Sequence, residues 1–251
     1  MRIFSDSWIM FKRCLTTTLR NPESFGQAII VPAFLMWVFA QVFGNVMDVG
    51  AYNYIDFIIP GIILQAASQG ISSTAICVNN DMSRGIVDRF RSMPIARSAV
   101  LTGHVLASVL RCMIAAAIII GVGVLLGARP QASFAGWFII ASVLIVFMLG
   151  ITWISVICGL VAKTPESAGT MMFPVFLLPF ISSGFAPTET MSAGLRAFAQ
   201  HQPMTPIIDT IRAIMMGMPA GNALPAALAW GAGITVAAFV ISVQIYKRKL
   251  A

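Results

Sequence analysis

Charged residues are scarce in this chain of 251 residues: only 10% are Asp, Glu, Lys or Arg, whereas 58% are hydrophobic. A soluble domain carries about 25% charged residues. The shortage of charge therefore excludes an ordinary soluble domain, and several apolar runs of about 20 residues are long enough to cross a bilayer. The composition predicts an all-α polytopic membrane protein that forms a single transmembrane domain over residues 1–251.

Motifs for catalysis and nucleotide binding are also missing. The chain has no GxxxxGK[ST] phosphate-binding loop, no HExxH zinc motif and no GxSxG nucleophile motif. Its four cysteines contain no CxxC pair, and His104 and His201 have no Cys or Asp at ligand spacing. We therefore expect free thiols and structural histidines, with no catalytic residue, no metal and no bound cofactor. A membrane-embedded enzyme is the least favoured function.

Apolar periodicity predicts six transmembrane helices. Their approximate ranges are 26–47, 54–78, 99–126, 134–162, 166–185 and 223–246.

Positively charged residues mark the cytoplasmic loops of membrane proteins. Twelve Lys and Arg residues lie on the side that holds both termini, the 79–98 segment and Lys163, and three lie on the other side, namely Arg129, Arg196 and Arg212. We therefore expect cytoplasmic N and C termini and a multi-pass location in the plasma or inner membrane.

The first 24 residues predict an amphipathic helix along the cytoplasmic interface. Apolar residues recur there at steps of three and four, namely Phe4, Trp8, Phe11, Leu15 and Leu19. The alternative is the first turn of a bent span. No cleavable signal peptide is recognisable in this region.

The segment 186–222 is too long for a plain turn and too apolar for a solvated loop. It predicts a short helix over Ala193–Gln200 and a second over Pro206–Gly217, with proline at the start and glycine at the end. Neither helix is long enough to cross a bilayer. We expect both to dip into the outer leaflet and to pack against protein.

The basic segment 79–98 lies between the second and third predicted spans. A short helix from Asp81 to Arg91 would place Arg84, Asp88 and Arg91 at steps of four and three, before a turn at Pro94. Such a peg suits a groove on a partner protein. A solvated loop that only carries cytoplasmic charge fits this stretch equally well.

A second group of residues has mechanical meaning inside the membrane. Arg111 lies about 20 Å along a helix from Ser98, where a charge must be paired, snorkel to the headgroups or face a cavity. Glu166, at the start of the fifth predicted span, is a candidate partner. Pro174 and Pro179 interrupt the hydrogen bonding of that span and are candidate hinge positions.

The order of these segments resembles the membrane subunit of a type-2 ABC transporter over nearly the whole chain. The run GIVDRFRSMPIARSAVLTG is similar to the daunorubicin-resistance branch of drug-exporting permeases. The resemblance implies a coupling helix at 81–95, which docks on a separate ATP-binding subunit. The residues expected in that role are Asp81, Arg84, Gly85, Asp88, Arg89, Phe90, Arg91 and Pro94.

The outer segment carries a second part of the resemblance, which implies two re-entrant helices there. The matching residues are Pro203, Pro206, Asp209, Arg212 and Gly217.

The resemblance also implies an assembly. Two ATP-binding subunits, which would hold ATP and Mg²⁺, are expected below two copies of this chain, or one copy and a related permease. ATP hydrolysis would then move an amphipathic drug, antibiotic or lipid-like substrate out of the cell, with no role for nucleic acid. The alternatives are a permease for polysaccharide or glycolipid export and an ion-coupled secondary transporter.

Overall fold

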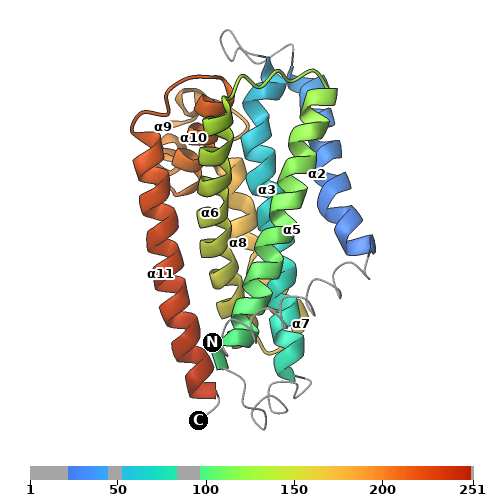
Figure 1. Ribbon diagram of the computed structural model, residues 1–251, viewed down its shortest axis with the longest axis vertical. Helices are drawn as coiled ribbons and strands as arrows, with labels where there is room; N and C mark the ends of the chain where they lie inside the picture. Colours follow the sequence, from blue (N-terminus) through green and yellow to red (C-terminus); the bar gives the residue numbers. More distant parts are fainter. Residues whose placement is uncertain (1–21, 45–52, 84–96, 250–251) are drawn as a thin grey trace.

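A computed structural model of the protein describes residues 22–44, 53–83 and 97–249, and all regular structure within these ranges is helical (Figure 1). The predictions for residues 1–21 and for 84–96 lie outside the described ranges. The elements are α2 (Pro22–Phe43), α3 (Tyr54–Ser83), α5 (Arg97–Leu125), α6 (Phe134–Val161), α7 (Pro165–Thr170), α8 (Phe173–Leu177), η1 (Leu178–Ile181), η2 (Thr188–Thr190), α9 (Ala193–His201), α10 (Met204–Met215) and α11 (Ala223–Lys249).

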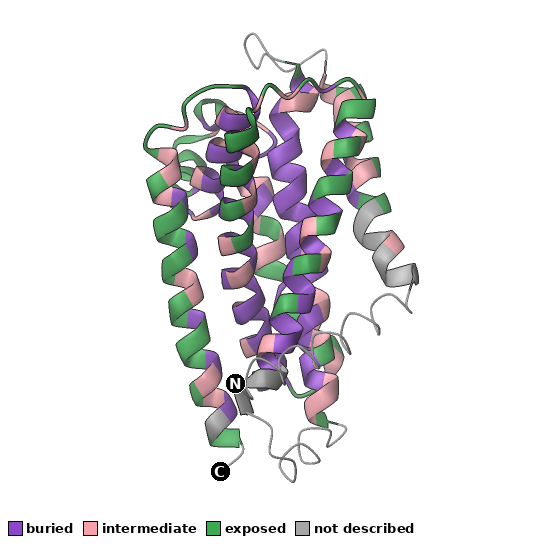
Figure 2. Cartoon of the chain, viewed as in Figure 1, coloured by how far each residue is buried: buried purple, intermediate pink, exposed green. Residues whose placement is uncertain are grey.

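Helix α3 forms the centre of the bundle. Its 30 residues extend for about 45 Å, and α2, α5, α6, α7 and α10 all pack against it. Figure 2 shows α3 buried along most of its length. Its first half is apolar on every side, which is the pattern of a helix surrounded by protein. Its large apolar side chains there are at most 1% exposed at Ile58, Ile59, Ile62, Ile63 and Leu64.

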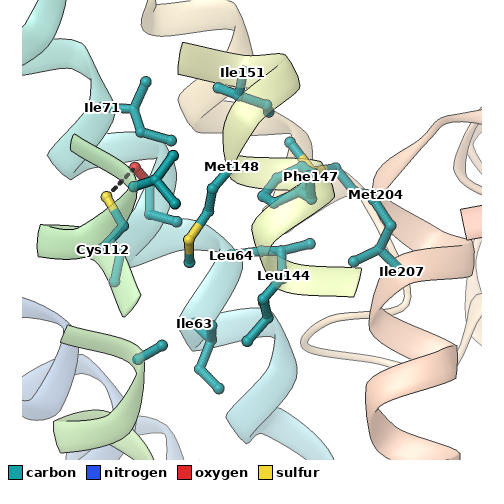
Figure 3. Packing of buried hydrophobic residues seen from close by; sticks show 14 of the residues in the cluster. Ile63, Leu64, Ile71, Cys112, Leu144, Phe147, Met148, Ile151, Met204 and Ile207 are labelled. Carbon is teal, nitrogen blue, oxygen red and sulfur yellow. Dashed lines mark hydrogen bonds between the residues drawn. The ribbon is translucent and has the colours of Figure 1, made fainter. Parts of the chain in front are cut away.

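The apolar core continues from α3 through α6 to α10. Figure 3 shows Leu64 beside Leu144 of α6, with Phe147 between these residues and the side chains of Met204 and Ile207. All five side chains are almost fully buried. The short helix α10 is therefore part of the packed body rather than a surface loop.

Helix α11 lies at the edge of the bundle and packs mainly on α6 (Figure 1). Gly231 allows this approach, because a Cβ atom there would lie 2.7 Å from Cγ1 of Val146. Most of the remaining surface of α11 is exposed (Figure 2). Its exposed side chains are large and apolar, as expected for contact with lipid, and include Trp230, Val236 and Phe239.

Four of the described helices are long and apolar enough to cross a membrane: α3, α6, and residues 101–125 and 223–246 of α5 and α11. They match the second, third, fourth and sixth predicted spans. The predicted end of the second span at 78 was too early, because α3 continues to Ser83. Helix α2 covers most of the first predicted span and begins at Pro22, where proline is well tolerated.

The fifth predicted span, 166–185, is not one continuous helix, and we call it the interrupted segment. It consists of α7, a turn, α8 and η1, because Pro174 and Pro179 supply no N–H groups for a regular ladder. The segment nevertheless runs along α3. Near one end Ser72 Oγ donates to the Gly169 carbonyl at 3.3 Å, and near the other end the Tyr54 hydroxyl donates to the Phe185 carbonyl at 3.0 Å.

The two short helices predicted in the outer segment are present as α9 and α10. Helix α10 begins at Met204, two residues before the predicted start, so Pro206 lies in its first turn, where a missing N–H is tolerated. It ends just before Gly217, whose φ of 71° is the left-handed conformation expected after a helix. The position of the pair in the outer leaflet stays a prediction.

The tightest contact of the interrupted segment with α3 joins two glycines. A Cβ atom at Gly61 would lie 2.6 Å from the backbone oxygen of Gly184. We expect Gly61→Ala to force the backbones apart and to lower the apparent melting temperature of the purified protein by several degrees, which corresponds to about 1–3 kcal/mol.

Gly233→Ala is the matched control, since a Cβ atom at this helical position meets nothing within 4 Å. The control should be neutral or slightly stabilising because alanine favours a helix. Thermal unfolding followed by fluorescence-detected size exclusion measures both variants. Equal melting temperatures for the two would contradict the close contact.

Candidate functional site

Most residues of the predicted coupling helix lie outside the described ranges, namely Arg84, Gly85, Asp88, Arg89, Phe90, Arg91 and Pro94. Asp81 is described, and its placement is corrected: it belongs to the last turn of α3, not to the start of a separate helix. Its Oδ2 lies 3.0 Å from Nε2 of His104 on α5. The contact is an ion pair when the imidazole is protonated. It joins α3 to α5 at the end of α3 that is followed by residues 84–96.

A second polar contact fixes the same end of the bundle. The Asn79 side-chain amide donates to the Gly159 carbonyl at 3.0 Å and to the Ala162 carbonyl at 2.8 Å. The last carbonyls of a helix have no partners within that helix, so Asn79 supplies donors for the end of α6. Together with the Asp81–His104 contact, it holds α3, α5 and α6 together where the 84–96 segment leaves α3.

Arg111 lies at the middle of α5, equally far from Arg97 and Leu125. Each end of the helix is about 21 Å away, which is beyond the reach of a snorkelling side chain. The guanidinium instead turns to α3, where Nη2 donates to the Gly70 carbonyl at 2.7 Å. The hydroxyls of Thr74 and Ser108 lie 3.5 and 3.4 Å from the same nitrogen.

Glu166 is not the counterion of Arg111. It is exposed in the first turn of α7, and no carboxylate of the described residues forms an ion pair with the guanidinium. In addition, Nε of Arg111 is buried without a hydrogen-bond partner. A charged side chain at this depth is costly and is usually associated with function.

The middle of α3 carries further polar side chains, which are named at the end of this paragraph. Together with Arg111 and Ser108 of α5, we call them the polar band. Ser73 Oγ donates to the same Gly70 carbonyl at 2.7 Å, which places it beside the guanidinium. The buried Oε1 atoms of Gln65 and Gln69 have no hydrogen-bond partner. The α3 members of the band are Gln65, Gln69, Ser72, Ser73 and Thr74.

Sequence reasoning singled out Arg111 but missed Gln65, Gln69 and Ser108. The two glutamines are four residues apart in an apolar span and therefore share one face of the helix. That spacing was a usable signal. The partner of Arg111 left no such signal, because Gly70 contributes only a backbone carbonyl.

The last part of the interrupted segment is stabilised by the turn between α9 and α10. Gln202 Nε2 donates to the carbonyls of Leu178 and Ile181 at 3.2 and 3.1 Å. These carbonyls lie in η1, which begins with Leu178 and the buried Pro179. Pro203 follows Gln202 and directly precedes α10. The turn thus supplies donors to carbonyls of η1, where the helical hydrogen bonding ends.

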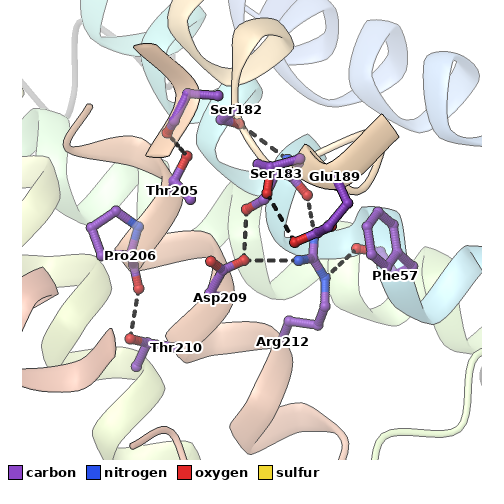
Figure 4. A network of polar contacts seen from close by, with 12 residues as sticks. Phe57, Ser182, Ser183, Glu189, Thr205, Pro206, Asp209, Thr210 and Arg212 are labelled. Carbon is purple, nitrogen blue, oxygen red and sulfur yellow. Dashed lines mark hydrogen bonds and ion pairs between the residues drawn. The ribbon is translucent and has the colours of Figure 1, made fainter. Parts of the chain in front are cut away.

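Arg212 forms the main polar network at the other end of the bundle (Figure 4). Its Nε donates to the Phe57 carbonyl at 3.1 Å, Nη1 donates to Asp209 Oδ1 at 2.9 Å, and Nη2 donates to the Ser183 carbonyl. The guanidinium carbon also lies 3.7 Å from the centre of the Phe57 ring. Ser183 Oγ completes the network by donating to Asp209 at 2.6 Å.

The network joins α10 to α3 and to the end of the interrupted segment. The Arg212 side chain is 13% exposed and that of Asp209 is 41% exposed, so the arginine that was counted as an outer-loop charge is largely buried. Burial lowers the pKa of Arg212 to about 10, which keeps the guanidinium charged at neutral pH. Burial also raises the pKa of Asp209, while Arg212 and the Ser183 hydroxyl favour its ionised form.

Comparison with known proteins connects this architecture to one family. The family model for the ABC-2 type transporter matches residues 6–216. The daunorubicin resistance ABC transporter permease protein DrrB1 of Streptomyces coeruleorubidus is 31% identical, over 91% of this chain and 81% of its own length. The probable doxorubicin resistance ABC transporter permease protein DrrC of Mycobacterium tuberculosis (strain ATCC 25618 / H37Rv) is 27% identical, over 98% and 90%.

The Arg212 network gives a testable stability difference. Arg212→Gln should destabilise the protein by about 2 kcal/mol, because it removes a largely buried charge and leaves carbonyl groups unpaired. Asp209→Asn should cost less, since an amide oxygen still accepts from Ser183 and Arg212. Unfolding by SDS in mixed micelles, followed by tryptophan fluorescence, measures both.

Arg196→Gln is the control for this comparison, because Arg196 is exposed on α9 and bonds only to nearby carbonyls. Its effect should stay within about 0.5 kcal/mol. A loss in Arg212→Gln no larger than that of the control would show that the network does not stabilise the fold.

Proposed function

Because this chain belongs to the ABC-2 type transporter family and is homologous to drug-resistance permeases, we propose that it is the transmembrane subunit of an ATP-driven exporter. The observation that carries the proposal is the 31% identity to a daunorubicin resistance permease over 91% of the chain. Similarity of this extent covers most of the chain and is not confined to one motif.

The energy for transport is proposed to come from a separate ATP-binding subunit, which would hold ATP and Mg²⁺. ABC-2 permeases normally pair with such a subunit, and this chain has no phosphate-binding loop. The proposed contact is the basic segment 84–96. It connects α3 to α5 at the end where Asp81, His104 and Asn79 hold three helices together, so a push on the segment would reach the bundle.

Two copies of the permease, or one copy and a related chain, are proposed to pair through α2 and the interrupted segment. Both carry large apolar side chains that the described part of the chain leaves uncovered. On α2 these are Ile30 and Phe34, 67% and 62% exposed, and on α8 Phe173 is 56% exposed. Proline interruptions beside such an interface would let the segment bend when the subunits move.

The cargo is proposed to be an amphipathic drug, antibiotic or lipid-like molecule, as the names of the relatives suggest. The polar band inside an otherwise apolar bundle suits a molecule with both kinds of surface. A polysaccharide or glycolipid is the alternative cargo. An ion-coupled transporter is less well supported, because the polar band contains no carboxylate and no histidine.

The coupling role can be tested by reversing charge in the basic segment. Arg84→Glu combined with Arg89→Glu should reduce ATP-dependent efflux at least about tenfold, because the segment would repel the groove that it normally enters. Efflux is measured in cells that co-express the ATP-binding subunit, together with the amount of permease in the membrane.

The control is Arg129→Glu combined with Arg196→Glu, which reverses two charges at the opposite end of the bundle. It should leave efflux within about twofold. Undiminished efflux from the variant in the basic segment would refute the coupling role, provided that both proteins reach the membrane in equal amounts.

The proposed orientation gives a separate prediction. Single cysteines replacing Gly50, Asp88 and Thr190 are introduced into a chain whose four native cysteines are replaced. In intact cells an impermeant maleimide should label the cysteines at positions 50 and 190 but not the one at 88, because 12 of the 16 basic residues are assigned to the cytoplasm. Labelling only at 88 would invert the topology.

A further inference from the structure

The polar band at the middle of α3 and α5 has properties of an unfilled binding site. Arg111 places a positive charge halfway along α5, against the middle of α3. No carboxylate among the described residues forms an ion pair with it. Its Nε is buried without a hydrogen-bond partner. Buried polar groups in folded proteins are nearly always hydrogen-bonded, so this exception requires an explanation.

The guanidinium lies at an accessible edge of the bundle rather than in its core. Gly70, Ser73 and Cys77 are spaced by three and four residues and form one stripe along α3. Ser73 is half-buried and Cys77 is exposed. Because Ser73 Oγ and Arg111 Nη2 donate to the same Gly70 carbonyl, the guanidinium lies beside this stripe. A molecule within the membrane can therefore approach it.

The charge of the site determines which ligands it accepts. A guanidinium donates to carboxylate, sulfate and phosphate oxygens with directed hydrogen bonds. An ammonium group would meet a positive charge with no carboxylate nearby, in a region of low dielectric constant where repulsion is strong.

We propose that Arg111, with Ser73 beside it, forms an intramembrane site for the anionic group of an amphipathic molecule. The inference rests on the proposed export function and specifies its cargo by charge: anionic amphiphiles are accepted and cationic ones are disfavoured, which separates this cargo from the amine-bearing drugs in the names of the relatives. The same oxyanion chemistry occurs in an exported compound and in the headgroup of a membrane lipid.

Binding of matched probes tests the site. The probes are BODIPY amphiphiles with one common tail that ends in a carboxylate, a hydroxyl or a trimethylammonium group. The full chain is held in phosphatidylcholine nanodiscs, with empty discs as background, and affinity is measured by fluorescence anisotropy. The carboxylate probe should bind about tenfold more tightly than the trimethylammonium probe.

Variants separate an anion site from a purely structural arginine. Arg111→Gln should remove the headgroup preference, and Arg111→Lys should keep most of it because the charge remains. Arg129→Gln, at an exposed position outside the band, should leave the preference unchanged. A wild-type protein without headgroup preference, or an Arg111→Gln variant that retains it, would overturn the proposal.

Ser73→Ala provides a second test if Arg111→Gln does not fold. It removes the hydroxyl beside the guanidinium without touching the bonds that Arg111 makes to α3. Binding of the carboxylate probe should weaken about threefold while binding of the trimethylammonium probe stays constant. Equal changes for the two probes would contradict the assignment.

Two further measurements identify the occupant and separate this inference from the export function. Competition by phosphatidylglycerol added to the discs would support an anion site that is occupied by lipid. Probe binding that phosphatidylglycerol does not reduce would support a site for exported compounds.

In proteoliposomes with the ATP-binding subunit, headgroup preference in binding without ATP-dependent transport would refute export but retain the site. Transport of all probes at equal rates, unaffected by Arg111→Gln, would refute the site but retain export.

Discussion

The polar groups of α3 must find hydrogen-bond partners inside a bundle that water does not reach, and the rest of the structure depends on how they do so. Each level of α3 is joined to a different neighbour. Near its last turn, Asn79 and Asp81 contact α6 and α5. At its middle the Gly70 carbonyl accepts from Arg111. Near its first turn the Phe57 carbonyl accepts from Arg212 of α10. α3 is thereby the helix that connects the two ends of the bundle.

The two buried arginines differ in how completely their guanidinium groups are hydrogen-bonded. The Arg212 guanidinium donates from all three nitrogens and has a carboxylate partner at 2.9 Å. Arg111 donates only from Nη2, and its Nε is buried without a partner. The first arrangement stabilises a junction between α3, α10 and the interrupted segment. The second leaves hydrogen-bonding capacity halfway along α5, beside the half-buried Ser73 of α3.

Much of the fold could be predicted because it depends on local patterns. Long apolar runs located α3, α5, α6 and α11 to within a few residues, and Gly217 correctly marked the end of α10. The fifth span was misjudged as one helix, although its prolines were recognised. Hydropathy measures how apolar a segment is, whereas the break depends on N–H groups that proline lacks. Gln202, from another part of the chain, then caps carbonyls at η1.

The amino-acid sequence by itself determined that the chain belongs in a membrane and which family it joins. Transfer of side chains from water to lipid is roughly additive along the chain, so composition and the distribution of Lys and Arg already indicate a membrane protein. The family follows from sequence similarity to known permeases. Only the tertiary structure decided the partners of the two buried arginines. Gly70 and Phe57 act through backbone carbonyls, which every residue possesses, and Glu166, the acidic candidate, lies exposed on α7. The choice between such partners depends on which helix faces come together in space.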